Sequence, residues 1–495
     1  MAKITKIIGY TVAVSALWFG GTAYISSTTE SYLDAYVKKT NNLYKSNGME
    51  MSVENFERGF FSSEVAVKID FIDPQAREII AKTLKLPINV NYSIENGPLF
   101  FKNGFGFGSS RVHTTVDLSE YVVDKDAFKK MFKDDIRLTS STSIDFLKNA
   151  SFSAKTNKIL LDVDGDAVEV SPLMIEGEMN IETFEGEMKM FIDSVQAKNN
   201  TEYIDIKDIV LDADISKFYD NGFYLGDFIL SVGSLSMKDE LLPFELKNAK
   251  IALDMNIDEN KDKTIDMKFK LHANVGESKL PSEYSSLHEV ELSYALNGTK
   301  LEGLLAFQDF TKTVQAKEQE ILKKLKTANG ELDMNALAEL EKLQVQTQDD
   351  LMLLIVGLLK TDKTNFDAEI KMIDKKAKES NLKMNIAYVG DENFPTSPRA
   401  LEKKFKKELL KLIAVDFDVN LEKDYIANLP MQLQQELAGQ LQIGTMFGIV
   451  KENNNSYSFD VNYKPNSLMI NGENRSEMLE MLEGSLPKVF EDNKY

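Results

Sequence analysis

Apolar and polar residues alternate along much of the chain between Met49 and Leu301. The clearest example runs from Ile265 to Val275, where every second residue is apolar. Successive side chains of a β-strand point to opposite faces of a sheet, so this pattern predicts strands with one buried face and one solvated face. The intervening segments carry the turn dipeptides Asn96-Gly97, Asn103-Gly104, Asp164-Gly165, Asn221-Gly222 and Asn297-Gly298. Such dipeptides favour tight hairpins, which indicates an antiparallel sheet.

The spacing of apolar residues becomes helical near Leu304. Helices are predicted at 304–326, 334–360 and 399–413, strands at 365–373, 382–388 and 415–421, and a last hairpin at 457–471. We therefore predict an α+β, β-rich fold: a large antiparallel meander sheet packed with C-terminal helices, preceded by one N-terminal transmembrane helix. The expected parts are 1–29 as a transmembrane anchor or signal peptide, 30–48 as a membrane-proximal helix, 49–301 as the antiparallel β-rich region, and 302–495 as a helix-plus-strand region packing on the same sheet.

Strands of this kind produce a long apolar sheet face that needs a cover. Three arrangements provide one: a sandwich of two sheets, a curved sheet whose concave face is covered by the C-terminal helices, or a sheet that forms an open apolar groove for lipid. The alternation identifies the residues of the apolar face, and it leaves the partner of that face open.

The N-terminal segment is the longest uncharged stretch of the chain. Lys3 and Lys6 precede it, and the run from Ile7 to Ile25 is predominantly apolar. A helix of that length spans roughly 28 Å, close to the hydrocarbon thickness of a bilayer. The lysines on one flank predict a cytoplasmic N-terminus, with the rest of the chain across the membrane. The residues expected to form this membrane anchor include Ile7, Ile8, Val12, Val14, Leu17, Trp18, Phe19, Tyr24 and Ile25.

A cleaved signal peptide is the alternative, because Gly21-Thr22-Ala23 fits the small-residue pattern before a cleavage site. Three features favour a retained anchor. The apolar run is longer than the usual core of a signal peptide, Trp18 and Tyr24 suit the membrane interface, and helix-forming sequence follows directly. We therefore expect a single-pass protein whose first partner is the lipid bilayer.

The 495-residue chain has a net charge of −20 and contains no cysteine. A surface of this sign repels phosphate groups, so we expect no nucleic-acid partner and no attraction to anionic lipid headgroups. The lack of cysteine excludes disulfides, thiolate metal sites and cysteine nucleophiles.

Several aromatic and glycine-rich motifs could carry a function. Gly104 to Gly108 alternates glycine with phenylalanine, but it lacks the lysine and the strand–loop–helix context of a phosphate-binding loop, so a bent strand is favoured. Phe60 and Phe61 could clamp a ligand, and Arg58 could bind an anion. Packing in a turn and pairing with a carboxylate are the more ordinary roles of these residues.

The polar motifs give no catalytic constellation. The three histidines, His113, His272 and His288, lack the helical spacing of shared zinc ligands. Two acidic segments have a spacing similar to that of a calcium-binding loop. The first contains Asp258, Asn260 and Asp262, and the second contains Asp162, Asp164 and Asp166. The first lacks the glycine and the terminal glutamate of an EF-hand, and the second is too short, so solvated turns are favoured. We expect no metal, no cofactor and no enzymatic activity.

Four stretches form a recognisable series from one end of the chain to the other. They are the anchor ending at Trp18-Phe19-Gly20-Gly21, the turn Arg58-Gly59-Phe60-Phe61-Ser62-Ser63, the turn Gly97-Pro98-Leu99, and the terminal hairpin ending at Asn471-Gly472. In this order they resemble the YdgA-like family of inner-membrane-anchored periplasmic proteins, whose function is unknown. That family commonly has histidine where this chain has Asn96. The resemblance implies a bacterial inner-membrane protein with a periplasmic body that forms homo-oligomers, and it implies no catalytic residue.

Three functions remain to be compared. The leading hypothesis is a non-enzymatic, membrane-tethered periplasmic protein that acts by binding in cell-envelope structure or assembly. The alternative is a periplasmic lipid-binding or lipid-transfer protein whose sheet forms an apolar groove, by analogy with AsmA-like proteins. An envelope hydrolase is the least favoured, because no nucleophile or metal set is visible in the sequence. The cover of the apolar sheet face distinguishes the first two hypotheses.

Overall fold

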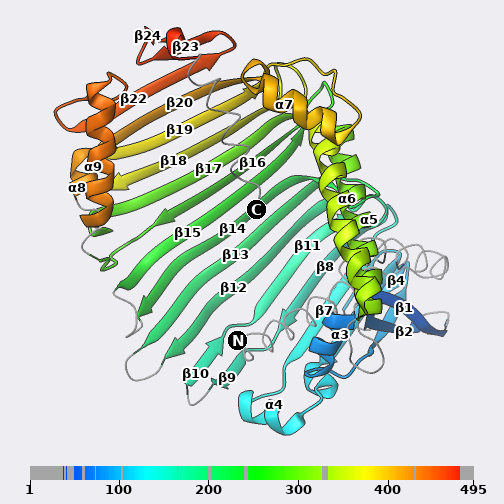
Figure 1. Cartoon of the computed structure of the whole chain (residues 1–495). Coiled ribbons are helices and arrows are strands. Elements are labelled where there is room, and N and C mark those ends of the chain that lie inside the picture. Colours follow the sequence, from blue (N-terminus) through cyan, green and yellow to red (C-terminus); the bar gives the residue numbers. More distant parts are fainter. Residues whose placement is uncertain are drawn as a thin grey trace. The chain divides into compact units, whose positions relative to one another are not determined.

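The computed structural model describes residues 37, 41 and 49–479, with gaps at 58, 60–61, 73, 102–103, 164–165, 199–201, 239–243, 282–283, 326–332 and 428–430. Contacts divide the chain into two compact units. Unit 1 comprises residues 1–232 and 312–339, and unit 2 comprises residues 233–311 and 340–495. Each unit is built on antiparallel strands with a few helices, as the alternation predicts (Figure 1).

Unit 1 is a ladder in which every paired strand is antiparallel to its neighbour. Its order is β1, β2, β3, β6, β7, β8, β11, β12 and β13. These strands are β1 (Met49–Glu57), β2 (Ser62–Phe71), β3 (Ile88–Asn96), β6 (Ser110–Asp117), β7 (Arg137–Ile144), β8 (Asn149–Thr156), β11 (Leu173–Asn180), β12 (Gly186–Lys198) and β13 (Tyr203–Phe218). A hairpin of β9 (Ile159–Val163) and β10 (Asp166–Val170) pairs with β12, and β4 (Leu99–Phe100) pairs with β5 (Gly106–Phe107) separately.

The first strands of unit 1 bury one face in a continuous hydrophobic core. Ile69, Ile88 and Tyr92 are completely buried in it. The cover consists of α3 (Pro74–Ala81), the 3-10 helix η2 (Leu118–Tyr121) and α4 (Lys125–Met131). Asp124 caps α4, because its carboxylate accepts a 2.8 Å hydrogen bond from the Ala127 N–H. This part of the sheet therefore has a solid core.

Unit 2 is also an antiparallel ladder. Its ladder runs in the order β15, β16, β17, β18, β19, β20, β22, β23 and β24, and β21 also pairs with β22. These strands are β15 (Glu245–Glu259), β16 (Thr264–Asn274), β17 (Leu287–Lys300), β18 (Asn365–Asp374), β19 (Glu379–Tyr388), β20 (Ile413–Glu422), β21 (Lys451–Glu452), β22 (Ser456–Lys464), β23 (Ser467–Ile470) and β24 (Glu473–Asn474). The division between the units passes through β14 (Tyr224–Lys238).

Helices of unit 2 lie at the ends of its strands (Figure 1). They are α7 (Pro398–Leu412), α8 (Lys423–Ala427), α9 (Met431–Met446) and the short η4 (Ser476–Met478), together with parts of α5 (Leu301–Leu325) and α6 (Met334–Leu358). Ser397 caps α7, whose first residue is the favourable Pro398. Gly303 of α5 lets that helix approach α6 closely, since a Cβ on Gly303 would lie 2.4 Å from the Gly357 carbonyl oxygen.

Within the described residues from Met49 onward, the predicted strands and helices agree with the structure apart from two of the turns, whereas Asp164-Gly165 and nearly all of the predicted 30–48 helix lie outside those residues. The change of period near Leu304 corresponds to the junction of β17 and α5, and the predicted helices correspond to α5, α6 and α7. Asn297-Gly298 was expected in a hairpin, but it lies inside β17, where a passing loop requires a glycine. Asn96-Gly97 likewise does not join two paired strands, because β3 pairs with β6 and the β4–β5 hairpin is inserted between them.

Within the described residues, every helix is too short or too polar to cross a bilayer. The residues proposed as the membrane anchor, Ile7 to Ile25, lie outside the described part of the chain.

Candidate functional site

Three rows of apolar side chains cross seven strands of unit 2, from β15 to β22. The first row is Leu253, Leu271, Leu292, Ile370, Leu382, Val419 and Phe459; the second is Met255, Phe269, Tyr294, Ala368, Met384, Phe417 and Val461; the third is Ile257, Met267, Leu296, Phe366, Ile386, Val415 and Tyr463. Side chains two residues apart on a strand share a face, so the strand register places all three rows on the same side of the sheet. We call this surface the apolar face.

The centre of the apolar face is open to solvent. Tyr294 is 44% exposed, Ile370 is 38% exposed and Phe366 is 36% exposed. The Phe269 and Tyr294 rings stack with their centroids 4.6 Å apart, so these aromatics pack side by side within the sheet surface. By contrast, Val419 and Tyr463 are buried. Among the described residues, the cover of this face therefore lies at its margins.

Helices close the apolar face at the two ends of its last strands. Residues of α8 and α9, Ile426 and Leu441, pack with Tyr457 and Phe459 at one end. Leu410 of α7 packs with Tyr463 and neighbouring residues at the other end. Figure 1 shows α8 and α9 at one end of β18, β19 and β20, with α7 at the opposite end. The exposed centre of the apolar face therefore lies between two sets of packed helices.

The opposite face of the same strands is polar and satisfied by its own ion pairs. Lys270 lies 3.0 Å from Glu291, and Lys383 lies 3.2 Å from Glu369. A shallow groove of about 660 Å³ runs over this face between two rows of polar side chains. In unit 1 a groove of about 770 Å³ has a similar lining of serines and carboxylates. The two faces thus differ in chemistry: ion pairs occupy the polar face, whereas large apolar side chains at the centre of the apolar face are exposed.

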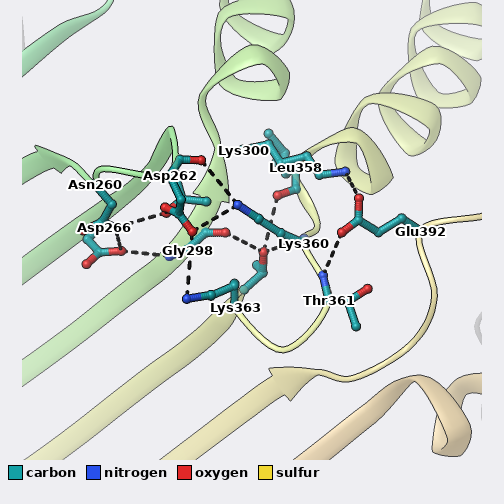
Figure 2. A network of polar contacts seen from close by, with 12 residues as sticks. Asn260, Asp262, Asp266, Gly298, Lys300, Leu358, Lys360, Thr361, Lys363 and Glu392 are labelled. Atoms are coloured by element: carbon teal, nitrogen blue, oxygen red, sulfur yellow. Dashed lines mark hydrogen bonds and ion pairs between the residues drawn. The ribbon is translucent and has the colours of Figure 1, made fainter.

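A polar network fastens the start of α5 and the end of α6 to the sheet (Figure 2). At its centre, the Asp262 carboxylate accepts hydrogen bonds from the Thr264 hydroxyl at 2.7 Å and from the Lys360 ammonium at 3.0 Å. Lys300 lies 2.6 Å from Glu392, which also accepts from the Thr361 N–H at 3.1 Å. The network joins the β15–β16 turn to the loop after α6 and to the loop after β19. It therefore fixes the backbone at one margin of the apolar face.

The same network shows why β17 contains Gly298. Its φ of +62° is in the left-handed region, and a Cβ there would lie 2.3 Å from the Lys363 carbonyl oxygen. The Gly298 N–H donates to Asp266 at 2.8 Å, and its carbonyl accepts from the Thr364 hydroxyl at 2.8 Å. The Asn-Gly dipeptide thus allows the loop after α6 to cross the strand.

We expect the Asp262→Asn variant to lose stability mainly above pH 4. Hydrogen bonds from Thr264 and Lys360 lower the pKa of Asp262 from 3.8 to about 2. Because the folded pKa is depressed, this stabilisation is present above pH 3.8 and disappears as the pH falls through about 2. Thermal unfolding midpoints of wild type and variant should therefore differ at pH 7 and converge near pH 2. The exposed Asp258→Asn variant is the control, and an equal difference at both pH values would contradict this role for Asp262.

One acidic motif and one of the histidines take part in polar contacts of unit 2. Asn260 and Asp262 belong to the network above, whereas Asp164 lies outside the described residues. His272 lies 3.0 Å from Glu289, and the potential ligand atoms of His272, Glu289 and Glu291 lie within 4.8 Å of one another. Helical spacing could not reveal this group, because β16 and β17 bring it together by register. Glu291 already pairs with Lys270, so an ion-pair cluster accounts for it.

Two of the family motifs meet at one end of unit 1. The Asn96 side chain donates to the Gly59 carbonyl at 2.9 Å and to the Ser63 hydroxyl at 3.4 Å. Ser62 is exposed and Ser63 is buried. Gly97 is sterically required, because a Cβ there would lie 1.8 Å from the Gly108 carbonyl oxygen. Pro98 follows through a cis peptide bond, and Leu99 is 43% exposed. Arg58, Phe60 and Phe61 lie outside the described residues.

The terminal motif has a structural role in unit 2. Asn471 and Gly472 both have positive φ, which asparagine and glycine tolerate. The Asn471 side chain accepts from the Asp460 N–H at 3.1 Å and donates to the Ile449 carbonyl at 2.8 Å. It therefore ties the last hairpin to the segment before β21. None of the described family-motif residues belongs to the apolar face, whose residues were detectable only as alternating strand positions.

Comparison with known proteins gives a family and no closer relative. A family described as "Bacterial protein of unknown function (DUF945)" matches residues 1–477. No curated protein and no solved structure matches the chain.

Proposed function

The chain belongs to the DUF945 family of bacterial proteins of unknown function, and we propose that it is a non-enzymatic binding protein that holds the acyl chains of a lipid on the apolar face of unit 2. The observation that carries this proposal is the exposure of Tyr294, Phe366 and Ile370 at the centre of that face. Large contiguous apolar surfaces on soluble domains mark sites of interaction.

The dimensions of the apolar face favour an extended chain molecule over a folded protein. The first and third rows are four residues apart on each strand, a distance of about 13 Å. The seven strands together are about 29 Å wide. The strip is therefore about 400 Å² in outline, about half of the 800 Å² that each partner contributes to a standard protein interface. A long, narrow strip of this kind suits an acyl chain lying across the strands.

The chemistry of the rows also favours a hydrocarbon ligand. Besides the hydroxyls of Tyr294 and Tyr463, the three rows contain only aliphatic, thioether and phenyl groups. The Tyr463 hydroxyl donates to the Leu410 carbonyl, so it is already used within the protein. A ligand with many polar groups would leave them unpaired on this surface, which is unfavourable. Burial of methylene groups contributes about 0.8 kcal/mol each, which is a sufficient driving force.

We place this activity in the bacterial cell envelope, with the predicted segment Ile7–Ile25 as an inner-membrane anchor and the body in the periplasm. The flanking Lys3 and Lys6 support that orientation. An anchored body has the bilayer as its lipid source. Lipid binding was the alternative hypothesis from the sequence, and the exposure of the apolar face favours it over the leading hypothesis of envelope structure or assembly through other partners.

Native mass spectrometry of the full chain tests the proposal. The protein would be purified in a mild detergent, and bound lipid would be identified after gentle activation. We expect lipid in a fixed molar ratio, retained after exchange into a second detergent. A protein that carries only detergent, or that buries the face in a homo-oligomer without lipid, would refute acyl-chain binding. An envelope role through protein partners would then be favoured.

A further inference from the structure

A second apolar surface lies in unit 1, at one end of its strands. It is formed by the β4–β5 hairpin and the turn between β7 and β8, and its large side chains are Leu99, Phe101, Phe105, Phe107, Phe146 and Leu147. Their exposed fractions range from 43% for Leu99 to 77% for Phe105 and Leu147. We call this surface the aromatic tip. It is separate from the apolar face, whose residues all belong to unit 2.

The aromatic tip is held in place by contacts beneath it. Phe100 is 1% exposed and anchors the hairpin, and the Arg111 guanidinium lies 4.7 Å from its ring. Arg111 also donates to the Gly104 carbonyl at 2.9 Å and to the Ser143 hydroxyl at 3.2 Å. These bonds join the hairpin to β7. The fold therefore holds the hairpin in a position that leaves the rings of Phe101, Phe105 and Phe107 exposed.

The two turns are packed together at the tip. The Phe107 and Phe146 rings meet edge to face with centroids 5.2 Å apart, and Phe101 lies 5.9 Å from Phe105. The Ser109 N–H donates to the Ile144 carbonyl at 2.8 Å, which fixes the base of the hairpin beside the second turn. The side chains thus form one apolar patch from two segments.

The charge of the tip departs from that of the whole chain. Residues 98–110 contain one charged residue, Lys102, and no carboxylate, although the chain has a net charge of −20. In the second turn, Asp145 accepts from the Leu147 and Asn149 N–H groups, and Lys148 pairs with Glu182. The charges around the tip balance, because Lys102 offsets Asp145 and Lys148 pairs with Glu182, so the tip lacks the net negative charge that would oppose its approach to a membrane.

We propose that the aromatic tip inserts into the interfacial region of the lipid bilayer. Protruding aromatic and leucine side chains at turn tips need no preformed pockets in a fluid interface, and aromatic residues are favoured at that depth. The predicted anchor ends at Ile25, twelve residues before Val37, which packs against the unit 1 core. Twelve residues span at most about 40 Å, so unit 1 stays near the bilayer. The insertion rests on that predicted anchor and is independent of lipid binding by unit 2.

Site-specific labelling of the full chain in vesicles tests the insertion. The chain has no cysteine, so Phe105→Cys provides a single site for an environment-sensitive fluorophore. Val123→Cys is the matched control, because Val123 is an exposed apolar residue of the same unit at the opposite end of β6. We expect the label at position 105 to shift to the blue and to lose its emission to nitroxide-bearing lipids. The label at position 123 should instead be quenched by aqueous iodide.

Other outcomes overturn the proposal in identifiable ways. A label at position 105 that is quenched by iodide would show that the tip is in water. A blue shift without quenching by nitroxide lipids would assign the tip to a protein partner or a second copy. Failure of the protein to float with the vesicles would remove the anchor on which the proposal rests. A double variant, Phe101→Ser with Phe107→Ser, should reduce lipid quenching at position 105, and undiminished quenching would also count against insertion. None of these results alters the lipid content measured for unit 2.

Discussion

The Tyr294→Glu variant should retain about one thirtieth of the lipid affinity of the wild-type protein. Tyr294 lies at the centre of the second row, and 44% of its surface is exposed. A carboxylate at this position would be placed against the acyl chain, and a charge at the centre of a hydrocarbon region costs about 2.5–3.5 kcal/mol. Discounted to about 2 kcal/mol for partial exposure, this corresponds to about thirtyfold in affinity. The measurement is the lipid occupancy from native mass spectrometry over a titration.

Ser293→Glu is the matched control for this variant. It introduces the same charge one residue away, but on the polar face, where Lys270 is its partner in register. Both substitutions are at accessible strand positions and should change the free energy of unfolding by no more than about 0.5 kcal/mol. Equal lipid occupancy in the two variants would contradict the assignment of the ligand to the apolar face.

Gly298→Val is expected to destabilise unit 2 by at least about 3 kcal/mol. The left-handed φ of +62° is unfavourable for a β-branched residue, and the new side chain would collide with the Lys363 main chain. The loop after α6 would have to move, and the hydrogen bonds to Asp266 and Thr364 would be lost. Hydrogen exchange of the β17 and β18 amides should accelerate by about a hundredfold, since 1.4 kcal/mol corresponds to tenfold.

Gly357→Ala supplies a control of opposite sign. Gly357 lies in α6, and a Cβ added there meets no atom within 4 Å. Alanine is favoured over glycine inside a helix by roughly 1 kcal/mol, and less at Gly357 because it is the next-to-last residue of α6, so this variant should be at least as stable as the wild type. If the β17 and β18 amides exchanged no faster in Gly298→Val than in Gly357→Ala, the loop that crosses β17 would not be the reason why position 298 is a glycine.

Alternation of residues predicted the antiparallel strands because each strand of unit 2 has one apolar and one polar face. The residues of the apolar face, such as Phe269 and Leu271, could be identified for the same reason. Their exposure could not be predicted, because the distance of the helices from the centre of the sheet depends on loop geometry. The network around Asp262 was also missed, since Lys360 lies 98 positions away in the chain.

The Asn-Gly and Asp-Gly dipeptides predicted a hairpin correctly only where the glycine lies in the turn between two paired strands. Gly104 lies in the β4–β5 turn with a φ of +99°, as its sequence predicts. Gly298 also follows an asparagine, but it does not form a hairpin turn. Glycine is needed there because a side chain would collide with the Lys363 carbonyl, which is distant in the sequence. The aromatic tip illustrates the same limit. Phe105 and Phe107 were interpreted as parts of a bent strand, but the short β5 leaves both rings at the surface.

Photo-crosslinking from neighbouring positions of β18 tests most directly whether lipid lies on the apolar face. A benzophenone amino acid would replace either Ile370 on the apolar face or Glu369 on the polar face, in the full chain within its native membrane. Ile370 is exposed and the Glu369 side chain is also partly accessible, so a crosslinker at either position can reach its surroundings. We predict a lipid adduct from position 370 and none from position 369. Equal adducts from both positions, or a protein adduct alone from position 370, would contradict acyl-chain binding by this face.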